Sequence, residues 1–287
     1  MRLLATADLH YNHAKSRATA DELIARVNAM ADAFDVLLVA GDVADGDSDF
    51  LERCLRQFTF PGPKLYAAGN HDLWTQTDDS RPILRQKLPE RLNKLGWHDL
   101  QQAPYVFDDA AVVGTVGWYD YAYAVNALGI PRRFYEHKLS PGAAEARQSH
   151  HHLLGDDVPA HARGVFARWN DGRFVKLHMS DDAFLEHLLE ELHRHLFAVS
   201  HKRTVVAVSH HVPLKCLLPP RAPGPQWDFA RAFLGSPKIG EAMLRYENVG
   251  HILCGHSHHA VYAEEQGRTA INIGGGYRNK EYVLVEA

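Results

Sequence analysis

The sequence predicts an α/β fold in which a mostly parallel sheet is flanked by helices and a second sheet forms later in the chain. Three observations support this prediction. Short apolar runs alternate with segments of helical periodicity over residues 1–70. Five apolar runs in the chain are followed by turns that carry Asp, Asn or His, which is typical of the ligand-binding edge of an open α/β sheet. Finally, short apolar runs between residues 261 and 285 favour antiparallel strands of a second sheet.

The first strand is predicted at residues 3–7. A helix follows over about residues 19–34, where apolar side chains recur at helical spacing, and the second strand, residues 36–40, leads into Gly41-Asp42. A second helix from Phe50 ends before Pro61-Gly62-Pro63. The third strand, residues 64–68, leads into Gly69-Asn70-His71-Asp72. This strand–helix alternation predicts parallel strands joined by right-handed crossovers.

Residues 81–95 are expected to be helical, and residues 105–107 and 111–117 to form a hairpin of strands. From residue 118 to residue 203 the strand pattern is absent, so we predict an α-helical, cap-like insertion within one domain that spans residues 1–287. The insertion closes with a helix that has Ser180 or Asp181 as its N-cap. Strands resume at residues 204–208 and 251–254, and short helices lie between them.

The bulk composition is that of a globular protein without special compartment signals. The chain has 287 residues, of which 46% are hydrophobic and 23% are charged. Its net charge of −4 means that it has no overall positive charge that would favour binding to long nucleic acid. Its three cysteines are scattered and have no C-x-x-C spacing, which favours reduced thiols in the cytoplasm. We expect no membrane segment, because no apolar stretch approaches the roughly 18 residues needed to span a bilayer.

Histidine is unusually abundant, with 20 residues, and several histidines lie at strand ends together with Asp and Asn. The strand-end set comprises Asp8, His10, Asp42, Asn70, His71, His210, His256 and His258. Oxygen and imidazole ligands without thiolate suit Mn²⁺, Fe, Zn²⁺, Ni²⁺ or Co²⁺. The set exceeds the needs of one catalytic ion, which takes about three protein ligands plus water. Two ions about 3.5–4 Å apart, bridged by one carboxylate, would use it fully.

Five motifs in this order resemble the calcineurin-like metallophosphoesterase superfamily: D-x-H, G-D-x-x-D, G-N-H-D, a strand-end His and G-H-x-H. The match covers residues 1–118 and 204–287 but not the insertion. The resemblance implies a four-layer α-β-β-α sandwich with two mixed sheets and with the insertion over the metal-site edge.

The resemblance also implies a role for each motif residue. Asp8, His10 and His258 would hold the first metal, Asn70, His210 and His256 the second, and Asp42 would bridge them. Mn²⁺ is the first expectation, with Fe, Zn, Ni or Co as alternatives. His71 would be the catalytic imidazole and Asp45 the carboxylate that orients it. A metal-bound hydroxide would attack phosphorus, while His71 stabilises charge or protonates the leaving oxygen.

The resemblance therefore implies a phosphohydrolase, and we expect a phosphodiesterase that acts on small phosphoesters or nucleotides. A DNA nuclease of the same superfamily is the alternative, although strong binding to duplex DNA is disfavoured by the mild acidity. A catalytically silent metal-binding scaffold is a further alternative, which the retention of every motif residue opposes. The oligomeric state is left open.

Several residues have two interpretations. Trp118, Tyr119 and Tyr121 could form a wall for the substrate, or could simply pack the insertion against the sheet. His211 could replace His210 at the metals or contact substrate. His150-His151-His152 suggests a further metal site or, with more weight, a solvated tract. Four arginines of the insertion could bind a second phosphate, and no spacing selects among them: Arg132, Arg133, Arg163 and Arg168.

Overall fold

The computed structural model describes all residues 1–287 and contains two mixed sheets with helices around them, which confirms the predicted α/β fold class. One sheet has five strands in the order β11-β1-β2-β3-β4, and the other has six in the order β5-β6-β7-β8-β10-β9. The strands of the first sheet are β1 (Arg2–Thr6), β2 (Val36–Ala40), β3 (Lys64–Ala67), β4 (Trp97–Asp99) and β11 (Tyr282–Glu286). Those of the second are β5 (Tyr105–Val106), β6 (Ala110–Thr115), β7 (Thr204–Ser209), β8 (Val249–Cys254), β9 (Val261–Glu265) and β10 (Arg268–Asn272).

The first sheet is parallel from β1 to β4, as the alternation of strands and helices predicts. Strand β4 was not expected, because its three residues, Trp-His-Asp, contain no apolar run. Helix α1 (Ala14–Ala29) begins earlier than the predicted residue 19, since its first turn is polar and carries no hydrophobic periodicity. The remaining helices that cover this sheet are α2 (Phe50–Leu55) and α3 (Leu88–Lys94).

The second sheet differs in part from the expectation for the last strands. β9 and β10 form the expected antiparallel pair, but β10 is parallel to β8. Strand β11 is antiparallel to β1 and belongs to the first sheet, so the assignment of residues 282–285 to a second sheet was wrong. An edge strand can join either sheet with the same alternating pattern, because the pattern fixes only which face is buried.

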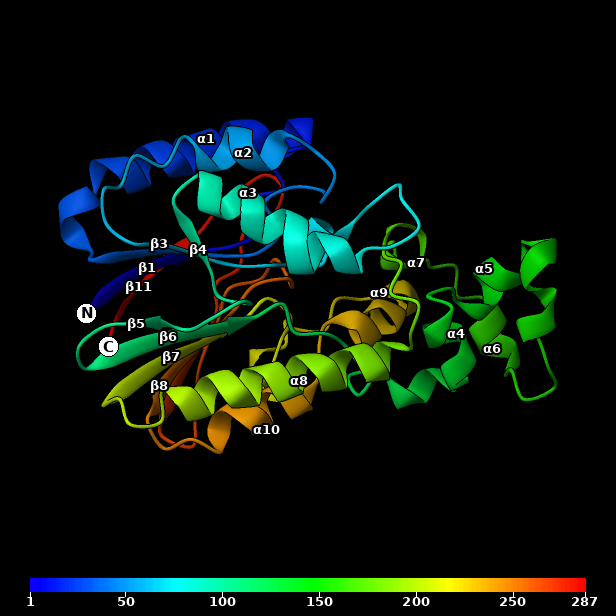
Figure 1. Cartoon of the computed structure of the whole chain (residues 1–287). Coiled ribbons are helices and arrows are strands. Elements are labelled where there is room, and N and C mark those ends of the chain that lie inside the picture. Colours follow the sequence, from blue (N-terminus) through cyan, green and yellow to red (C-terminus); the bar gives the residue numbers. More distant parts are fainter.

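The two sheets face each other across an apolar core. A cluster of 17 buried side chains joins residues of β1, β2 and β3 to residues of β6, β7 and β8. Helices α1, α2 and α3 lie on the outer side of the first sheet, and α8 (Asp181–Ala198) and α10 (Pro237–Leu244) lie on the outer side of the second (Figure 1). Strands buried on both faces are continuous apolar runs, which explains why they were found easily in the sequence.

The segment between β6 and β7 is helical, as predicted. Its last helix, α8, packs against β6 and α10, and Ser180 caps it by accepting a hydrogen bond from the Ala183 amide at 3.1 Å. The shorter helices of the segment extend away from the sheets, at the end of the molecule opposite the two termini (Figure 1). They are α4 (Arg132–Glu136), α5 (Pro141–Glu145), α6 (Ala160–Arg163) and α7 (Asp171–Phe174).

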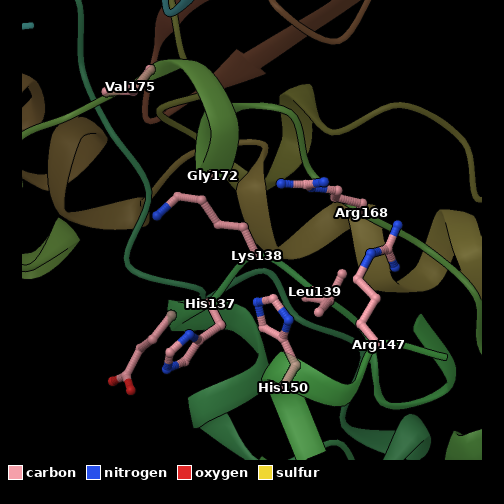
Figure 2. A pocket seen from close by; sticks show the side chains of 9 residues that line it. His137, Lys138, Leu139, Arg147, His150, Arg168, Gly172 and Val175 are labelled. Atoms are coloured by element: carbon pink, nitrogen blue, oxygen red, sulfur yellow. The ribbon is translucent and has the colours of Figure 1, made fainter. Parts of the chain in front are cut away.

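The remaining elements are short. Helix α9 (Pro225–Ala230) precedes α10, and single turns of 3-10 or π helix connect other elements: η1 (Ala31–Ala33), η2 (His71–Leu73), η3 (Ile83–Lys87), η4 (Asn126–Leu128), η5 (Gln148–Leu153), η6 (Lys215–Leu217) and η7 (Arg231–Phe233). Residues of α4, η5 and α7 border a small polar cavity, shown in Figure 2. None of the helices combines the length and the apolarity that a membrane span requires.

Candidate dinuclear metal site

The eight strand-end residues predicted from the sequence meet at one place in the structure. They follow the carboxyl ends of β1, β2 and β3 in the first sheet and of β7 and β8 in the second. Parallel strands end at the same edge, so side chains from distant parts of the chain converge there. Three overlapping groups have ligand atoms within 4.8 Å of one another: Asp8, His10 and His258; His10, Asp42 and His71; and Asp42, His210 and His256.

Asp42 lies between the two sides of the cluster. Its Oδ2 is 3.3 Å from His210 Nε2 and 3.9 Å from His10 Nε2. Its other carboxylate oxygen, Oδ1, accepts a hydrogen bond from the His71 amide at 2.9 Å. Burial disfavours ionisation of Asp42, but the imidazoles of His210 and His71 outweigh this, and its pKa lies well below its usual value. An ionised Oδ2 placed in this way can contact a cation on either side.

The donor set fits two metal ions. On one side, His10 Nε2 and His258 Nε2 point at each other at 2.9 Å, and on the other, His210 Nε2 and His256 Nδ1 do so at 3.2 Å. Imidazole nitrogens converge in this way when they share a cation. The Oδ1 of Asn70 is buried without a hydrogen-bond partner, while its amide nitrogen donates to Asp171. An orphaned buried oxygen is costly unless a ligand meets it, so Asn70 Oδ1 is suited to bind a metal.

Five candidate ligands have a left-handed backbone, which non-glycine residues adopt uncommonly. Their φ angles are 58° for Asp8, 43° for His10, 56° for Asp42, 69° for His256 and 57° for His258. Such a conformation costs about 1–3 kcal/mol per residue and persists only where its surroundings fix it. Here the turn after β1 is tied to the turn after β2, because the amides of Asp8 and His10 donate to the carbonyls of Gly41 and Asp42 at 3.0 and 2.8 Å.

The glycines before the ligands have two different roles. Gly41 has a φ of 86°, a left-handed conformation that glycine adopts without strain. Gly69 and Gly255 do not have positive φ angles. They are needed for close packing instead, because a Cβ on Gly69 would lie 2.2 Å from Asp42 Oδ1 and one on Gly255 would lie 2.7 Å from the Ala7 Cβ.

His71 lies beside the ligand groups and faces Asp45. Its Nε2 is 3.9 Å from Asp42 Oδ2, and its Nδ1 is 3.5 Å from Asp45 Oδ1. The ring stacks on Trp74 with centroids 3.6 Å apart, which fixes its plane. Burial lowers the pKa of His71, but the carboxylates of Asp42 and Asp45 raise it more, so the net shift is upward. The imidazole therefore has one nitrogen toward the cluster and the other toward a carboxylate.

Asp171, at the start of α7, was missed by sequence reasoning. Its fully buried carboxylate accepts four hydrogen bonds, from Asn70 Nδ2 at 2.9 Å, Trp74 Nε1 at 2.7 Å, Trp169 Nε1 at 2.7 Å and the Tyr119 hydroxyl at 3.1 Å. It thereby orients Asn70 and the indole on which His71 stacks. No apolar strand precedes Trp169-Asn170-Asp171-Gly172, so the strand-end rule could not find it.

We expect Asp171→Asn to weaken metal binding on the Asn70 side by about 10–100-fold, because the partner that orients this residue is altered. An amide cannot accept all four hydrogen bonds, so the free energy of unfolding should also fall by about 1.5–3 kcal/mol. Activity measured against Mn²⁺ concentration and urea denaturation would give the two values.

The matched control is Asp181→Asn, since Asp181 is a second buried carboxylate of the same segment. It accepts hydrogen bonds from Trp118 Nε1 and Lys138 Nζ at 2.7 and 2.6 Å and contacts no candidate ligand. We expect it to lower stability without changing the Mn²⁺ dependence. Equal Mn²⁺ dependence for the two variants would contradict the role given to Asp171.

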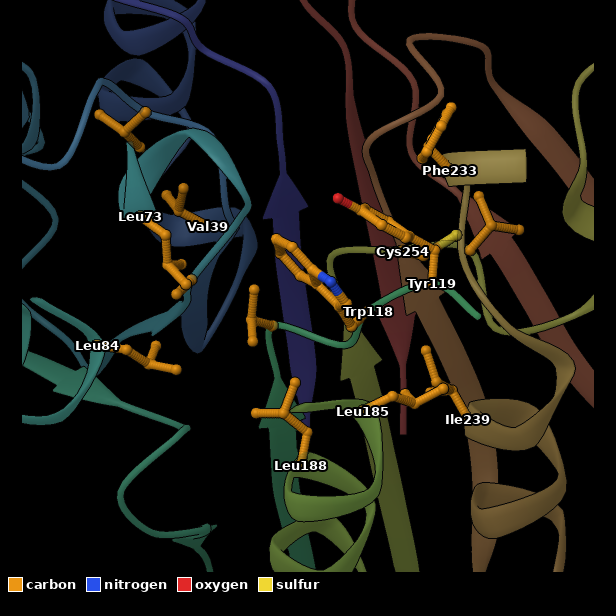
Figure 3. Close-up of a cluster of buried hydrophobic side chains, with 14 of the residues drawn as sticks. Val39, Leu73, Leu84, Trp118, Tyr119, Leu185, Leu188, Phe233, Ile239 and Cys254 are labelled. Carbon is orange, nitrogen blue, oxygen red and sulfur yellow. The ribbon is translucent and has the colours of Figure 1, made fainter. Parts of the chain in front are cut away.

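The aromatic residues suggested as a substrate wall lie in the packed interior. Trp118, Tyr119 and Tyr121 are buried, and Figure 3 shows the first two among Leu185, Leu188 and Phe233. Tyr119 donates to Asp171, and Trp118 and Tyr121 donate to Asp181. Their positions correspond to the packing interpretation.

His211 lies beside the ligand groups but is not part of them. Its Nδ1 is bonded to the Val116 carbonyl at 3.0 Å, and its ring lies 4.4 Å from that of His256. It contributes no atom to the three groups of converging ligands, whereas His210 does.

A cavity of about 510 Å³ opens on the cluster. Asp42, Asn70, His71, His256 and His258 line one part of it. The other part is mainly aromatic and apolar, with Trp74, Trp169, Trp227, Tyr277, Pro219 and Pro220. None of these aromatic residues was singled out from the sequence as a cavity residue, because they come from four separate segments of the chain. The cavity combines a polar, metal-competent floor with a wall suited to an organic group.

Comparisons with known proteins identify the family of the chain and relate its fold to solved structures. A sequence profile described as calcineurin-like phosphoesterase matches residues 1–260. The structure is similar to a phosphopantetheinyl hydrolase from Mycobacterium tuberculosis, with a TM-score of 0.67 and 20% identity over 96% of this chain and 89% of that one. It is also similar to a dimetal phosphatase from Danio rerio, with a TM-score of 0.53 and 15% identity over 99% and 91% of the two chains. No curated protein sequence matches the chain.

Proposed function

Because this chain belongs to the calcineurin-like phosphoesterase family and is a hydrolytic phosphoesterase, we propose that it cleaves small organic phosphodiesters with two bound metal ions. The observation that carries the proposal is the position of Asp42 Oδ2 between two groups of ligands, at the floor of a cavity with an aromatic wall. The floor supports phosphoryl chemistry, and the wall accommodates an organic group attached to the phosphate.

In this proposal, Asp8, His10 and His258 hold one ion, Asn70, His210 and His256 hold the other, and Asp42 contacts both. When bound, such a pair supplies Lewis acidity toward phosphoryl oxygens and lowers the pKa of water. We propose Mn²⁺ as the ion, with Fe, Zn, Ni or Co as alternatives, since oxygen and imidazole ligands suit all of them.

His71 performs the proton chemistry in this proposal. It lines the cavity, and its Nε2 lies on the side of the cluster where a phosphoryl group would bind. From there it can donate a hydrogen bond to a phosphoryl oxygen and a proton to the leaving oxygen. Asp45 faces Nδ1 and holds the tautomer with its proton on that nitrogen, while stacking on Trp74 fixes the ring.

The compartment proposed for this activity is the cytoplasm. All three cysteines are free, and Cys54 and Cys254 are buried. Unpaired, buried thiols in a chain of this size are typical of a reducing environment.

A metal-dependent substrate screen tests the proposed function. We expect the purified protein to hydrolyse bis-p-nitrophenyl phosphate with Mn²⁺, to lose this activity in excess chelator and to regain it on addition of Mn²⁺. Diesters should be cleaved at least about tenfold faster than p-nitrophenyl phosphate, because the cavity accommodates a second organic group.

The screen should include nucleoside 2′,3′- and 3′,5′-cyclic phosphates, single- and double-stranded DNA, and a phosphopantetheinyl group, which the hydrolase of similar fold is described as acting on. Activity confined to monoesters would overturn the diesterase proposal. A preference for duplex DNA over small diesters would favour the nuclease alternative.

A further inference from the structure

The structure separates the four arginines that the sequence left equivalent. Three of them are paired with carboxylates: Arg132 with Glu136 and Asp182, Arg133 with Asp157, and Arg163 with Glu145. Arg168 forms no ion pair and no side-chain hydrogen bond. Arg168 is exposed and unpaired, so its guanidinium donors are available for an anion.

Arg168 lies in a cationic pocket of about 270 Å³, which we define by His137, Lys138, Arg147, His150 and Arg168. Figure 2 shows the side chains of these five residues around the pocket. Arg147 also forms no ion pair, and its Nη1 donates only to the Ala143 carbonyl at 2.9 Å. Lys138 is neutralised by Asp181 at 2.6 Å, and Glu136, at the border, is paired with Arg132.

The positive charge of this pocket is uncompensated. Burial and the nearby Arg173 and Arg147 lower the pKa of Arg168. Burial and neighbouring histidines likewise lower the pKa values of His137 and His150. Burial first, and then the neighbouring positive groups, disfavour the charged form of each residue, and an anion in the pocket would offset this.

The histidines of the pocket do not form a metal site. The ring centroids of His137, His150 and the neighbouring His152 are 5.7–6.5 Å apart. None of these histidines belongs to a group of three residues whose ligand atoms lie close enough to share a metal ion. The arginines would also repel a cation. The pocket is thus suited to an anion.

Arg168 connects this pocket to the proposed catalytic cavity, since it lines both. Its backbone is held in place by an isolated antiparallel bridge to Leu139, and the Trp169 amide donates to the Lys138 carbonyl at 2.9 Å. The next residues, Trp169 and Asn170, line the catalytic cavity as well. A molecule that lies with one end at the metal ligands can therefore reach Arg168 with the other.

We propose that the cationic pocket binds a second anionic group of the substrate, a phosphate or a carboxylate, while the scissile phosphodiester lies at the metal ligands. This proposal rests on the proposed function only for the cleavage of the phosphodiester at the metal ligands. It makes the preferred substrate a small diester with a further anionic group, and it gives the region between β6 and β7 a role in specificity.

A matched pair of chromogenic substrates tests the proposal. Thymidine 5′-(p-nitrophenyl phosphate) and its 3′-phosphorylated form release the same p-nitrophenol and differ only in one anionic group. We expect the wild-type protein to prefer the 3′-phosphorylated form about tenfold or more in kcat/KM, mainly through KM, because charge-assisted hydrogen bonds add to binding.

The variants Arg147→Ala and Arg168→Ala should each reduce this preference to near one, whereas Arg194→Ala should retain it. Arg194 is an exposed arginine of α8 whose only carboxylate contact is Glu191 at 3.9 Å, so it controls for net charge. The same preference in all four proteins, or no preference in the wild type, would overturn the proposal.

A second measurement does not depend on turnover. Inorganic phosphate is titrated calorimetrically into the Mn²⁺-loaded wild-type protein and the same three variants. We expect two classes of phosphate site in the wild type and in Arg194→Ala, and loss of one class in Arg147→Ala and Arg168→Ala. Identical isotherms for all four proteins would overturn the anion pocket, even if the protein proves to be an active diesterase. Loss of one class in a protein that cleaves no diester would instead retain the pocket and reject the proposed function.

Discussion

Asp42→Asn should lower kcat/KM by at least about a thousandfold, since it removes the anionic oxygen that lies between both ligand groups and is preorganised at the reacting centre. The oxygen at stake, Oδ2, is the nearest carboxylate oxygen to His210 Nε2 and also faces His10 and His71. The substitution preserves volume, and Oδ1 can still accept the His71 amide, so folding should be little affected. Metal content by mass spectrometry should fall well below two ions per chain.

The comparison for this variant is His10→Ala, which removes a ligand whose Nε2 faces His258 rather than His210. We expect His10→Ala to retain about one ion per chain and Asp42→Asn to retain less. If Asp42→Asn bound two ions with unchanged affinity, the bridging role of Asp42 would be wrong.

His71→Ala is expected to reduce kcat by about 10²–10⁴-fold, the usual contribution of a positioned acid or base, without loss of metal. The reduction should depend on the leaving group. It should be small for p-nitrophenolate, which leaves without protonation, and large for an alkyl alcohol, which requires a proton. Paired rates on an aryl and an alkyl ester of the same phosphate would measure this difference.

Two further variants serve as comparisons for His71→Ala. Asp45→Asn should lower kcat in the same leaving-group-dependent way but to a smaller extent, because it acts only through His71 Nδ1. His13→Ala should have little effect, although the His13 ring is only 6.3 Å from that of His71, since it contributes no atom to the ligand groups. Equal hydrolysis of bis-p-nitrophenyl phosphate and of the alkyl ester with and without His71 would refute the assignment.

Most of the fold was accessible from the sequence because its strands are buried on both faces. β1, β2, β3, β7 and β8 are continuous apolar runs between polar turns, and such runs are distinctive even in a single sequence. β4 and the sheet to which β11 belongs were not predictable. Strand β4 has no apolar run. The sheet that β11 joins depends on which sheet edge the chain reaches after β10, and local sequence does not specify this.

In the region from residue 118 to residue 203, local sequence patterns predict only part of the secondary structure and do not predict the roles of the aromatic residues. Helix α8 was recognisable from its long apolar face and its N-cap, whereas the short helices before it have too few turns for a periodicity. The same limitation applies to Trp118, Tyr119 and Tyr121. Their aromatic character predicts burial or contact with a ligand equally well, and only the surrounding contacts distinguish the two.

The sequence by itself was enough to predict the family and the residue types of the proposed dinuclear site, which follow the ends of apolar strands. It could do so because the carboxyl ends of neighbouring parallel strands lie along one edge, which groups Asp8, Asp42 and Asn70 in the first sheet and His210 and His256 in the second. The packing of the two sheets then brings these groups together. Only the tertiary structure decided what supports the site and what borders it. Asp171, which bonds to Asn70, begins a one-turn helix, and Arg168, which lines both cavities, precedes it. Neither segment is long enough for a periodicity that would relate position in the chain to position in space.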